Sequence, residues 1–123
     1  IRGICCLIPT HHKNIKVISI IDRFLEHTRI FIFNNNKKNE TYISSADWMT
    51  RNLDNRVEVT CPIHDSKIKK EINDIFNIYW SDNVKSRLIN QKDANVYKSD
   101  IKKSNSIRSQ LEIYNYYKSK IEN

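Results

Sequence analysis

Residues 22–33 read DRFLEHTRIFIF and residues 42–59 read YISSADWMTRNLDNRVEV, and these two segments carry the densest pattern in the chain. In a β-strand, side chains two positions apart share a face, so His27 and Arg29 project together while Thr28 and Ile30 point the other way. An imidazole that titrates near neutral pH and a permanently charged guanidinium on one face are suited to binding phosphate. We therefore expect a phosphate site at the start of this strand.

The flanking sequence predicts strands followed by helices. Short β-branched or alternating runs predict strands at residues 4–8, 15–21, 29–33, 40–44 and 56–61. The run at 29–33 is apolar on both faces, which predicts a central strand, and Pro62 is expected to end the strand at 56–61. Apolar residues at helical spacing predict core-covering helices from Ser66 through Tyr79 and from Ile107 through Ile121. This order is typical of an α/β domain.

Two polar segments are predicted as connections. Residues 34–39 are rich in asparagine, which tolerates left-handed backbone angles and so forms a turn without glycine. Residues 90–106 are polar and rich in lysine, which predicts a surface loop.

Composition indicates one domain over residues 1–123 with a polyanionic partner. Lys and Arg number 21 against 14 Asp and Glu, which gives a formal net charge of +7 and a pI of about 9.4. Nucleic acid, polyphosphate and anionic lipid all satisfy this charge. The plain interpretation of the lysine clusters at 37–38, 67–70 and 102–103 is solvated surface.

Cysteine usage and the absence of targeting signals favour a cytoplasmic protein. Three cysteines, with Cys5 and Cys6 adjacent, cannot form a complete disulfide set, which favours a reducing compartment. The sequence contains no C-x-x-C or H-x-x-x-H pair, so we predict no metal site. The chain begins at Ile1 and shows neither a secretory signal nor a membrane-spanning run, so we expect a fragment of a longer soluble protein.

Several segments match one protein family in order along the chain. They are residues 1–7 (IRGICCL), 18–27 (ISIIDRFLEH), 44–49 (SSADWM) with Arg51 and Asn52, 56–59 (RVEV) and a tail helix around 110–117. On these segments the chain resembles the C-terminal domain of bacterial polyphosphate kinase, a family that moves the terminal phosphate of ATP onto polyphosphate. Several matches in register are more specific than a single short motif.

The resemblance implies a fold, a site and partners. The implied fold is phospholipase D-like, a mixed β-sheet flanked by helices with a C-terminal amphipathic helix, in one of two facing domains. Arg2 is implied to contact an ATP phosphate, and His27 to act at the ATP site as a proton donor or phosphate ligand, where Arg29 adds a second guanidinium. The phosphorylated histidine and the Mg²⁺-associated residues are implied to lie in an upstream domain, so we expect the isolated fragment to be inactive.

The implied substrates are ATP or ADP and inorganic polyphosphate. The implied partners are the upstream domains of the same polypeptide, in a homo-oligomer that admits peripheral membrane association and has no role for nucleic acid.

Glu58 is a candidate orienting residue. In phospholipase D folds a carboxylate holds the second ring nitrogen of the histidine, and Glu58 is expected to do the same for His27. The alternative is an ion pair of Glu58 with Arg56 or Arg51.

Ser44 and Ser45 are candidate phosphate ligands. They stand where phospholipase D relatives place a Gly-Ser-x-Asn element, beside a helix that is expected to begin near Trp48 and to aim free amides at an anion. The alternative is that these serines, or Asp47, cap that helix. Arg29 replaces the lysine of the His-x-Lys motif and Asp47 replaces the asparagine, which argues against diester hydrolysis.

Two other functions stay open at this point. One is a phospholipase D-like nuclease half-site. The other is a basic module that binds polyanions through scattered lysines without performing chemistry.

Overall fold

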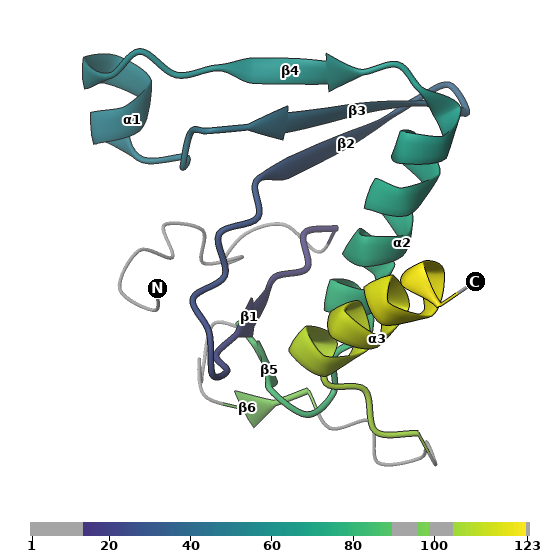
Figure 1. The fold of residues 1–123 in the computed structure, drawn as a ribbon. Coiled ribbons are helices and arrows are strands. Elements are labelled where there is room, and N and C mark those ends of the chain that lie inside the picture. The colour runs from purple at the N-terminus through teal and green to yellow at the C-terminus, as the bar shows by residue number, and fades with distance from the viewer. Residues whose placement is uncertain (1–13, 90–95, 99–104, 123) are drawn as a thin grey trace. The chain divides into compact units, whose positions relative to one another are not determined.

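The structure is a computed structural model that describes residues 14–89, 96–98 and 105–122 (Figure 1). Its elements in chain order are β1 (Ile18–Ile20), β2 (Ile30–Asn35), β3 (Lys38–Ser44), α1 (Thr50–Asn55), β4 (Thr60–Ile63), α2 (Ser66–Ser81), β5 (Ser86–Leu88), β6 (Val96–Tyr97) and α3 (Ser109–Ile121). The chain forms two compact units, unit 1 (Ile1–Glu26 and Asn77–Asn123) and unit 2 (His27–Phe76), and α2 contributes residues to both. The single-domain assignment over residues 1–123 stays a prediction.

Unit 2 is built on an antiparallel sheet with the strand order β2-β3-β4, and the three strands lie side by side in Figure 1. The register sets Phe31 opposite Tyr42 across β2 and β3, and Tyr42 opposite Pro62 across β3 and β4. Among the described strands, β3 therefore occupies the centre of this sheet. The expectation that the apolar run at 29–33 forms the central strand is wrong for the described part of the chain.

A two-residue turn joins β2 to β3. Asn36 and Lys37 have φ values of 46° and 68°, and a type I′ hairpin turn requires left-handed angles at both positions. The side-chain oxygen of Asn34 accepts a hydrogen bond from the Lys37 N–H at 3.1 Å. The turn is shorter than the expected 34–39 because both strands continue up to the two turn residues.

The strand β4 starts later than predicted and contains the proline that was expected to end it. Among the described strands β4 has a neighbour on one side only, and an edge strand tolerates Pro62 because the missing N–H can face the free edge. The preceding residues Val57 and Val59 are 100% and 67% exposed. Their alternation therefore buries no face, and this part of the predicted strand 56–61 is wrong.

The core of unit 2 is small, and α2 begins where the sequence predicted. The buried residues in this unit are Thr41, Ala46, Asn52 and Ile75. The carboxylate of Asp65 accepts hydrogen bonds at 2.8 and 2.9 Å from backbone N–H groups in the first turn of α2. This N-cap satisfies donors that the helix itself leaves unpaired, so α2 starts at the residue after Asp65.

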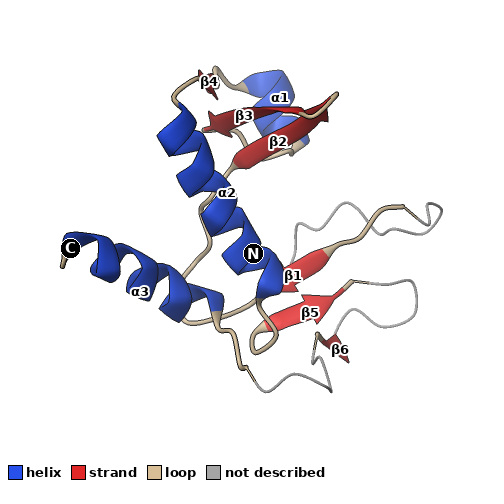
Figure 2. Cartoon of the chain, turned by 90° about the vertical axis from the view of Figure 1, so that its right-hand side faces the viewer, coloured by secondary structure: helices blue, strands red, loops and turns tan. Residues whose placement is uncertain are grey.

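Unit 1 holds a second antiparallel sheet with the order β1-β5-β6, in which β1 and β5 lie side by side (Figure 2). β1 is shorter than the strand predicted at 15–21, and the strand predicted at 4–8 lies outside the described residues. β5 was not predicted, and β6 falls inside the predicted loop at 90–106. Each has only two or three residues, which is too few to show an alternating pattern.

Asp82 organises the turn after α2 and the start of α3. It is fully buried. Its Oδ1 accepts from the N–H groups of Val84, Lys85 and Ser86 at 3.0, 2.7 and 3.0 Å, and its Oδ2 accepts from both N–H and Oγ of Ser109 at 2.7 Å. Burial raises the pKa of Asp82, but these hydrogen bonds outweigh burial and leave the pKa below its ordinary value.

A bidentate ion pair ties the segment after β1 to the residue before α3. Arg108 donates through Nε and Nη2 to the two carboxylate oxygens of Asp22 at 2.8 and 2.6 Å. The Asp22 side chain is only 2% exposed, and the hydrogen bond from Arg108 lowers its pKa. A paired fork of this kind is the strong form of a charge-assisted hydrogen bond.

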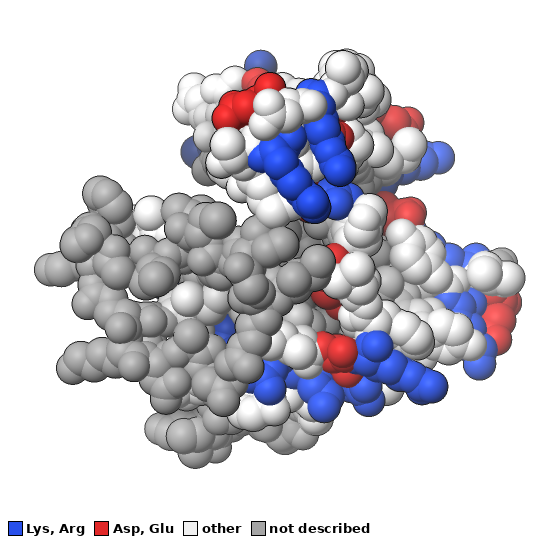
Figure 3. All heavy atoms as spheres, turned by 90° about the vertical axis from the view of Figure 1, so that its left-hand side faces the viewer, with Lys and Arg blue, Asp and Glu red and all other residues white. Residues whose placement is uncertain are grey.

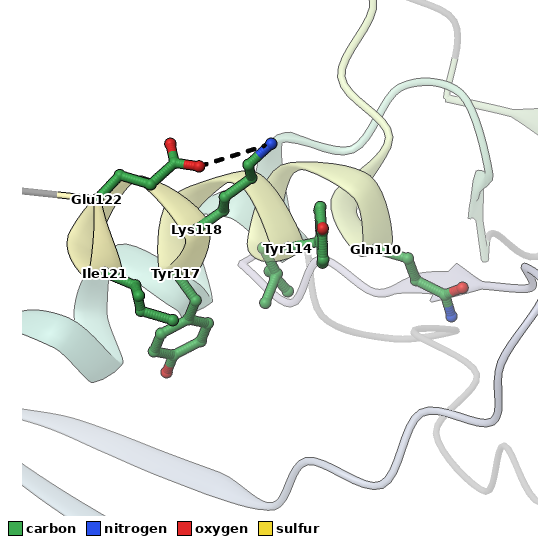
Figure 4. Close-up of a pocket in the computed structure, with 7 residues that line it drawn as sticks. Gln110, Tyr114, Tyr117, Lys118, Ile121 and Glu122 are labelled. Atoms are coloured by element: carbon green, nitrogen blue, oxygen red, sulfur yellow. Dashed lines mark ion pairs between the residues drawn. The ribbon is translucent and has the colours of Figure 1, made fainter.

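The helix α3 forms in the predicted region, but its apolar side faces outward. Leu111, Tyr114 and Ile121 are 52%, 62% and 84% exposed. Tyr114, Tyr117 and Ile121 line one pocket along the helix with Gln110, Lys118 and Glu122 (Figure 4). The expectation that this side of the tail helix covers a core is therefore wrong for the described residues.

The α/β class and the C-terminal helix are confirmed. The predicted mixed β-sheet is observed as two sheets in which every described strand pairing is antiparallel. Among the described helices, none combines the length and apolar character needed to cross a bilayer.

Candidate functional site

Five of the six site residues predicted from the sequence lie in unit 2. They are His27, Arg29, Ser44, Ser45 and Glu58, whereas Arg2 lies outside the described residues. Because the strands are antiparallel, the start of β2, the end of β3 and the start of β4 meet at one end of the sheet, beside α1 (Figure 1). The five residues lie on the segments that enter or leave this end.

Arg29 is fixed through both its main chain and its side chain. Its carbonyl oxygen accepts a hydrogen bond from the N–H of Ser44 at 3.0 Å. Its Nε donates to Oδ1 of Asp47 at 2.7 Å, and the Arg29 and Asp47 side chains are 16% and 40% exposed. This hydrogen bond raises the pKa of Arg29 and lowers the pKa of Asp47, so both groups are charged at neutral pH.

His27 meets the other side of the same guanidinium. Arg29 Nη1 lies 3.0 Å from Nδ1 of His27, and Arg29 Nη2 lies 3.3 Å from Nε2. Nη1 also donates to the carbonyl oxygen of His27 at 3.3 Å. The two side chains project together, as their spacing in the sequence predicted, and His27 is exposed to solvent. A guanidinium and an imidazole therefore stand within hydrogen-bond distance of each other.

Glu58 is held by two neutral side chains. Its Oε2 accepts from the Ser45 hydroxyl at 2.5 Å, and its Oε1 accepts from Nδ2 of Asn52 at 2.8 Å. These bonds, the one from Ser45 first, lower the pKa of Glu58. The expected hydrogen bond from the His27 ring to Glu58 is not formed in this structure, because the carboxylate accepts from Ser45 and Asn52. The alternative ion pair with Arg56 or Arg51 is not formed either, although the charge of Arg56 also lowers the Glu58 pKa.

The two serines lock the end of β3 to the start of β4. Ser45 Oγ accepts from the N–H of Val59 at 3.0 Å, and the N–H of Ser45 donates to the Val59 carbonyl at 3.0 Å. Ser44 Oγ lies 2.9 Å from Oγ1 of Thr60 and accepts from the N–H of Ala46 at 3.1 Å. Both hydroxyls therefore already have protein partners, and their common effect is to fix the turn that carries Asp47.

The capping role considered for Ser44, Ser45 and Asp47 is wrong. The residue before α1 is Met49, and no side-chain hydrogen bond caps this helix. The Asp47 carboxylate is instead bonded to Arg29. With six residues starting at Thr50, α1 is also too short to build an anion site on its free amides, so the expected helix-terminus contribution is not supported.

Sequence reasoning missed two members of this cluster. Asp47 was identified only as a replacement for asparagine and a possible cap, and Asn52 only as part of the family pattern. The sequence did hold a signal for Asp47. Arg29 replaces the lysine and Asp47 replaces the asparagine of the phospholipase D motifs, and two such changes, which together put a carboxylate and an arginine in the site, indicate an ion pair. Asn52 gave no such signal, because its burial, 3% exposed, depends on the path of the chain after β3.

The surroundings of the cluster carry mixed charge. Figure 3 faces this end of unit 2 and shows Lys and Arg side chains beside acidic ones. Arg51 and Arg56 are both exposed, and their charges help to lower the pKa of Asp47 and Glu58 respectively. Among the described residues, no group of three or more His, Cys, Asp or Glu side chains is placed to bind a metal ion.

The chain is similar to known proteins along nearly all of its length. Residues 1–110 match the family described as Polyphosphate kinase C-terminal domain 2. The chain is 49% identical over 123 residues to a polyphosphate kinase of Vibrio parahaemolyticus, covering 96% of this chain and 17% of that protein. It is 50% identical over 124 residues to one of Klebsiella pneumoniae, covering 97% and 18%.

A solved structure gives the same result for the fold. The crystal structure of polyphosphate kinase from Porphyromonas gingivalis superposes with a TM-score of 0.91 at 46% identity, covering 98% of this chain and 19% of that chain. The chain thus spans less than a fifth of each of these three relatives.

Proposed function

Because this chain belongs to the Polyphosphate kinase C-terminal domain 2 family, we propose that it supplies a phosphate-binding C-terminal part of a polyphosphate kinase. The proposed reaction is the reversible transfer of the terminal phosphate of ATP to inorganic polyphosphate. Since the chain covers only 17% and 18% of two relatives that carry this name, the proposal assigns the remaining functions to other parts of a longer polypeptide.

The observation that carries the proposal is the contact of Arg29 with His27. Phosphoryl transfer needs positive charge and hydrogen-bond donors around the oxygens of the transferred group, and it needs little covalent help from the protein. A guanidinium offers a planar fork for two phosphate oxygens. We assign Arg29 to this role because its Nε is held by Asp47 while its two terminal nitrogens lie 3.0 and 3.3 Å from the imidazole.

His27 is assigned to the leaving oxygen or to a phosphate oxygen beside it. An imidazole can donate a proton to the oxygen that leaves with ADP and can accept it back in the reverse reaction. The exposure of His27 supports this role, since a bound nucleotide can reach the ring from solvent.

The other candidate residues receive different roles. Arg2 is proposed as a further phosphate ligand on the basis of the resemblance alone. Ser44 and Ser45 are proposed to shape the turn that carries Asp47, because a direct bond from Ser45 to phosphate requires its hydroxyl to leave Glu58. Glu58 is proposed to orient Ser45 and Asn52 rather than the imidazole.

The proposal places the phosphorylated histidine and the Mg²⁺ ligands outside this chain. Its substrates are ATP or ADP and polyphosphate, and Mg²⁺ supplies charge neutralisation on the transferred phosphates when bound. The proposed setting is the cytoplasm, in a homo-oligomer that admits peripheral membrane association and has no nucleic-acid partner.

A chimera tests this function. The chain replaces the matching segment of the Vibrio parahaemolyticus polyphosphate kinase, to which it is 49% identical, and polyphosphate formed from ATP is measured. We expect the chimera to be active. His27→Gln should lower kcat by about 10²- to 10⁴-fold, the range that general acid–base catalysis contributes.

His64→Gln is the matched control, since His64 is a second exposed histidine in unit 2. A folded but inactive chimera, or equal activities of the two glutamine variants, contradicts the proposal. Cleavage of a phosphodiester substrate would favour the nuclease function instead. Salt-dependent polyphosphate binding without transfer, unchanged by His27→Gln, would favour the passive basic module.

A further inference from the structure

Asp47 occupies one edge of the Arg29 guanidinium and leaves the other edge to His27. A guanidinium can bind two phosphate oxygens through its two terminal nitrogens, or through Nε and one terminal nitrogen. Asp47 bonds to Nε at 2.7 Å and so occupies the second of these edges. The edge that remains is formed by Nη1 and Nη2, and both of these atoms face His27.

The position of Asp47 is set by its neighbours on both sides. Before it, Ala46 is buried, and its N–H donates to Ser44 Oγ at 3.1 Å. After it, the ring of Trp48 stacks on Phe31 with centroids 5.3 Å apart and an interplanar angle of 22°. The carbonyl of Asp47 itself accepts from the N–H of Met49 at 2.8 Å. The turn therefore delivers the carboxylate to a fixed place.

Arg29 is anchored to the same turn. The N–H of Ser44 donates to the carbonyl of Arg29 at 3.0 Å, so the start of β2 and the turn after β3 share one framework. Phe31, which lies in β2 two residues after Arg29, carries the stacked Trp48. Both partners of the ion pair are thus held from the backbone.

The Arg29–Asp47 ion pair is expected to orient the guanidinium more than it stabilises the fold. The Asp47 side chain is 40% exposed, and ion pairs that are open to water contribute little to folding stability. The other nearby carboxylate, Glu58, is bonded to Ser45 and Asn52 and does not compete for the guanidinium. A free arginine side chain samples many rotamers, so fixing one of them ahead of binding removes an entropic cost from phosphate recognition.

We propose that Asp47 is a positioning residue, which turns Arg29 so that its two terminal nitrogens and the imidazole of His27 grip one phosphate group. This inference rests on the proposed function. Asp47 would act through Arg29 without touching the substrate. The Arg29–Asp47 ion pair would orient the guanidinium toward the phosphate.

The test uses the chimera described above with Asp47→Asn, Asp47→Glu and the matched control Asp54→Asn. Asp54 lies on α1 in the same unit, is exposed and loses the same charge. We expect Asp47→Asn to lower kcat/KM by about 10- to 100-fold, the scale of a small misplacement of a reacting group. Asp47→Glu should recover part of the loss because it keeps the carboxylate, and Asp54→Asn should have no effect.

Two further measurements separate orientation from folding. In an Arg29→Lys background, which lacks Nε, Asp47→Asn should cause no additional loss, because the two residues act as one device. The melting temperature of Asp47→Asn should stay close to that of Asp54→Asn. Multiplicative losses in the double variant, or a kinetic loss that follows a drop in melting temperature, would overturn the proposal.

Tripolyphosphate binding to the same chimeras, followed by calorimetry, keeps this inference distinct from the proposed function. Should the parent chimera make no polyphosphate, the proposed function fails, and the positioning role is then decided by affinity. Weaker tripolyphosphate binding by Asp47→Asn than by Asp54→Asn supports the role of Asp47. Equal affinities of these two variants contradict it.

Discussion

The hydroxyl of Ser45 lies 2.5 Å from Oε2 of Glu58. The same hydroxyl oxygen accepts a hydrogen bond from the N–H of Val59 at 3.0 Å, and the second oxygen of Glu58 accepts from the buried Asn52. The carboxylate therefore joins the turn after β3 to the helix α1. These hydrogen bonds fix the turn that carries Asp47, and so they support the Arg29–Asp47 ion pair.

Asn52→Ala should destabilise the protein by about 1 to 2 kcal/mol, because it removes a donor to a carboxylate and leaves a small cavity at a residue that is 3% exposed. Chemical denaturation measures the free energy of unfolding. Asn55→Ala, at the exposed end of the same helix, should change it by less than about 0.5 kcal/mol. Equal effects of the two substitutions would show that Asn52 is not a structural link.

Asp82→Asn should cost on the order of 3 kcal/mol of stability. Both oxygens of Asp82 accept hydrogen bonds, from three backbone N–H groups on one side and from Ser109 on the other. An asparagine must turn its NH₂ group toward one of these sets of donors, which leaves buried donors unpaired. Denaturation of Asp82→Asn beside Asp54→Asn tests this, and similar midpoints would contradict it.

Acid should destabilise the protein below about pH 4. The pKa values of Asp22 and Asp82 lie below their ordinary value of 3.8 in the folded state, so the unfolded chain binds more protons in this range. Their contribution to stability is present above pH 4 and is lost as the pH falls through the folded pKa values. Denaturant midpoints measured from pH 7 to pH 3 should fall, and Asp22→Asn should flatten that fall.

A pH profile that is the same for Asp22→Asn and the parent protein would contradict the role of the Arg108–Asp22 pair. The comparison has a built-in check at pH 7, where Asp22→Asn should be the less stable protein because it lacks the charged partner of Arg108.

Lys37→Gly should stabilise the protein by roughly 0.5 to 1 kcal/mol. Lys37 has a φ of 68° in the turn between β2 and β3, and glycine adopts this angle without the steric penalty of a Cβ atom. Lys38→Gly is the control, since Lys38 lies in β3 and glycine weakens a strand. Thermal unfolding should rank Lys37→Gly above the parent protein and Lys38→Gly below it, and the reverse order would contradict the turn assignment.

The sequence predicted where helices and strands lie along the chain better than it predicted which of them pack or pair with each other. The helices α2 and α3 and the strands β2 and β3 were found because their apolar spacing is long enough to read. The strand β4 was misplaced because alternation at Val57 and Val59 normally indicates burial, whereas both residues are exposed. The short strands β5 and β6 gave no pattern, and their pairing depends on contacts distant in sequence.

The candidate site was predicted only in part, because local sequence patterns do not show contacts between residues that are distant in the sequence. His27 and Arg29 lie two residues apart just before β2, and this short separation was enough to bring their side chains together although neither residue is in a strand. The partners of Glu58 and Arg29 come from other elements, so no local pattern indicated that Glu58 holds Ser45 or that Asp47 holds Arg29. For Glu58, the analogy with phospholipase D folds predicted the imidazole of His27 as the partner. The path of this chain instead brings Ser45 and Asn52 to the carboxylate.

The most direct test asks whether His27 and Arg29 act on the same phosphate. Polyphosphate synthesis from ATP is measured in the chimera for His27→Gln, for Arg29→Lys and for the double variant. Because both side chains are proposed to grip one group, the double variant should lose no more than about threefold beyond the worse single variant. Losses that multiply would mean that the two residues act independently, and that result would contradict the shared phosphate site.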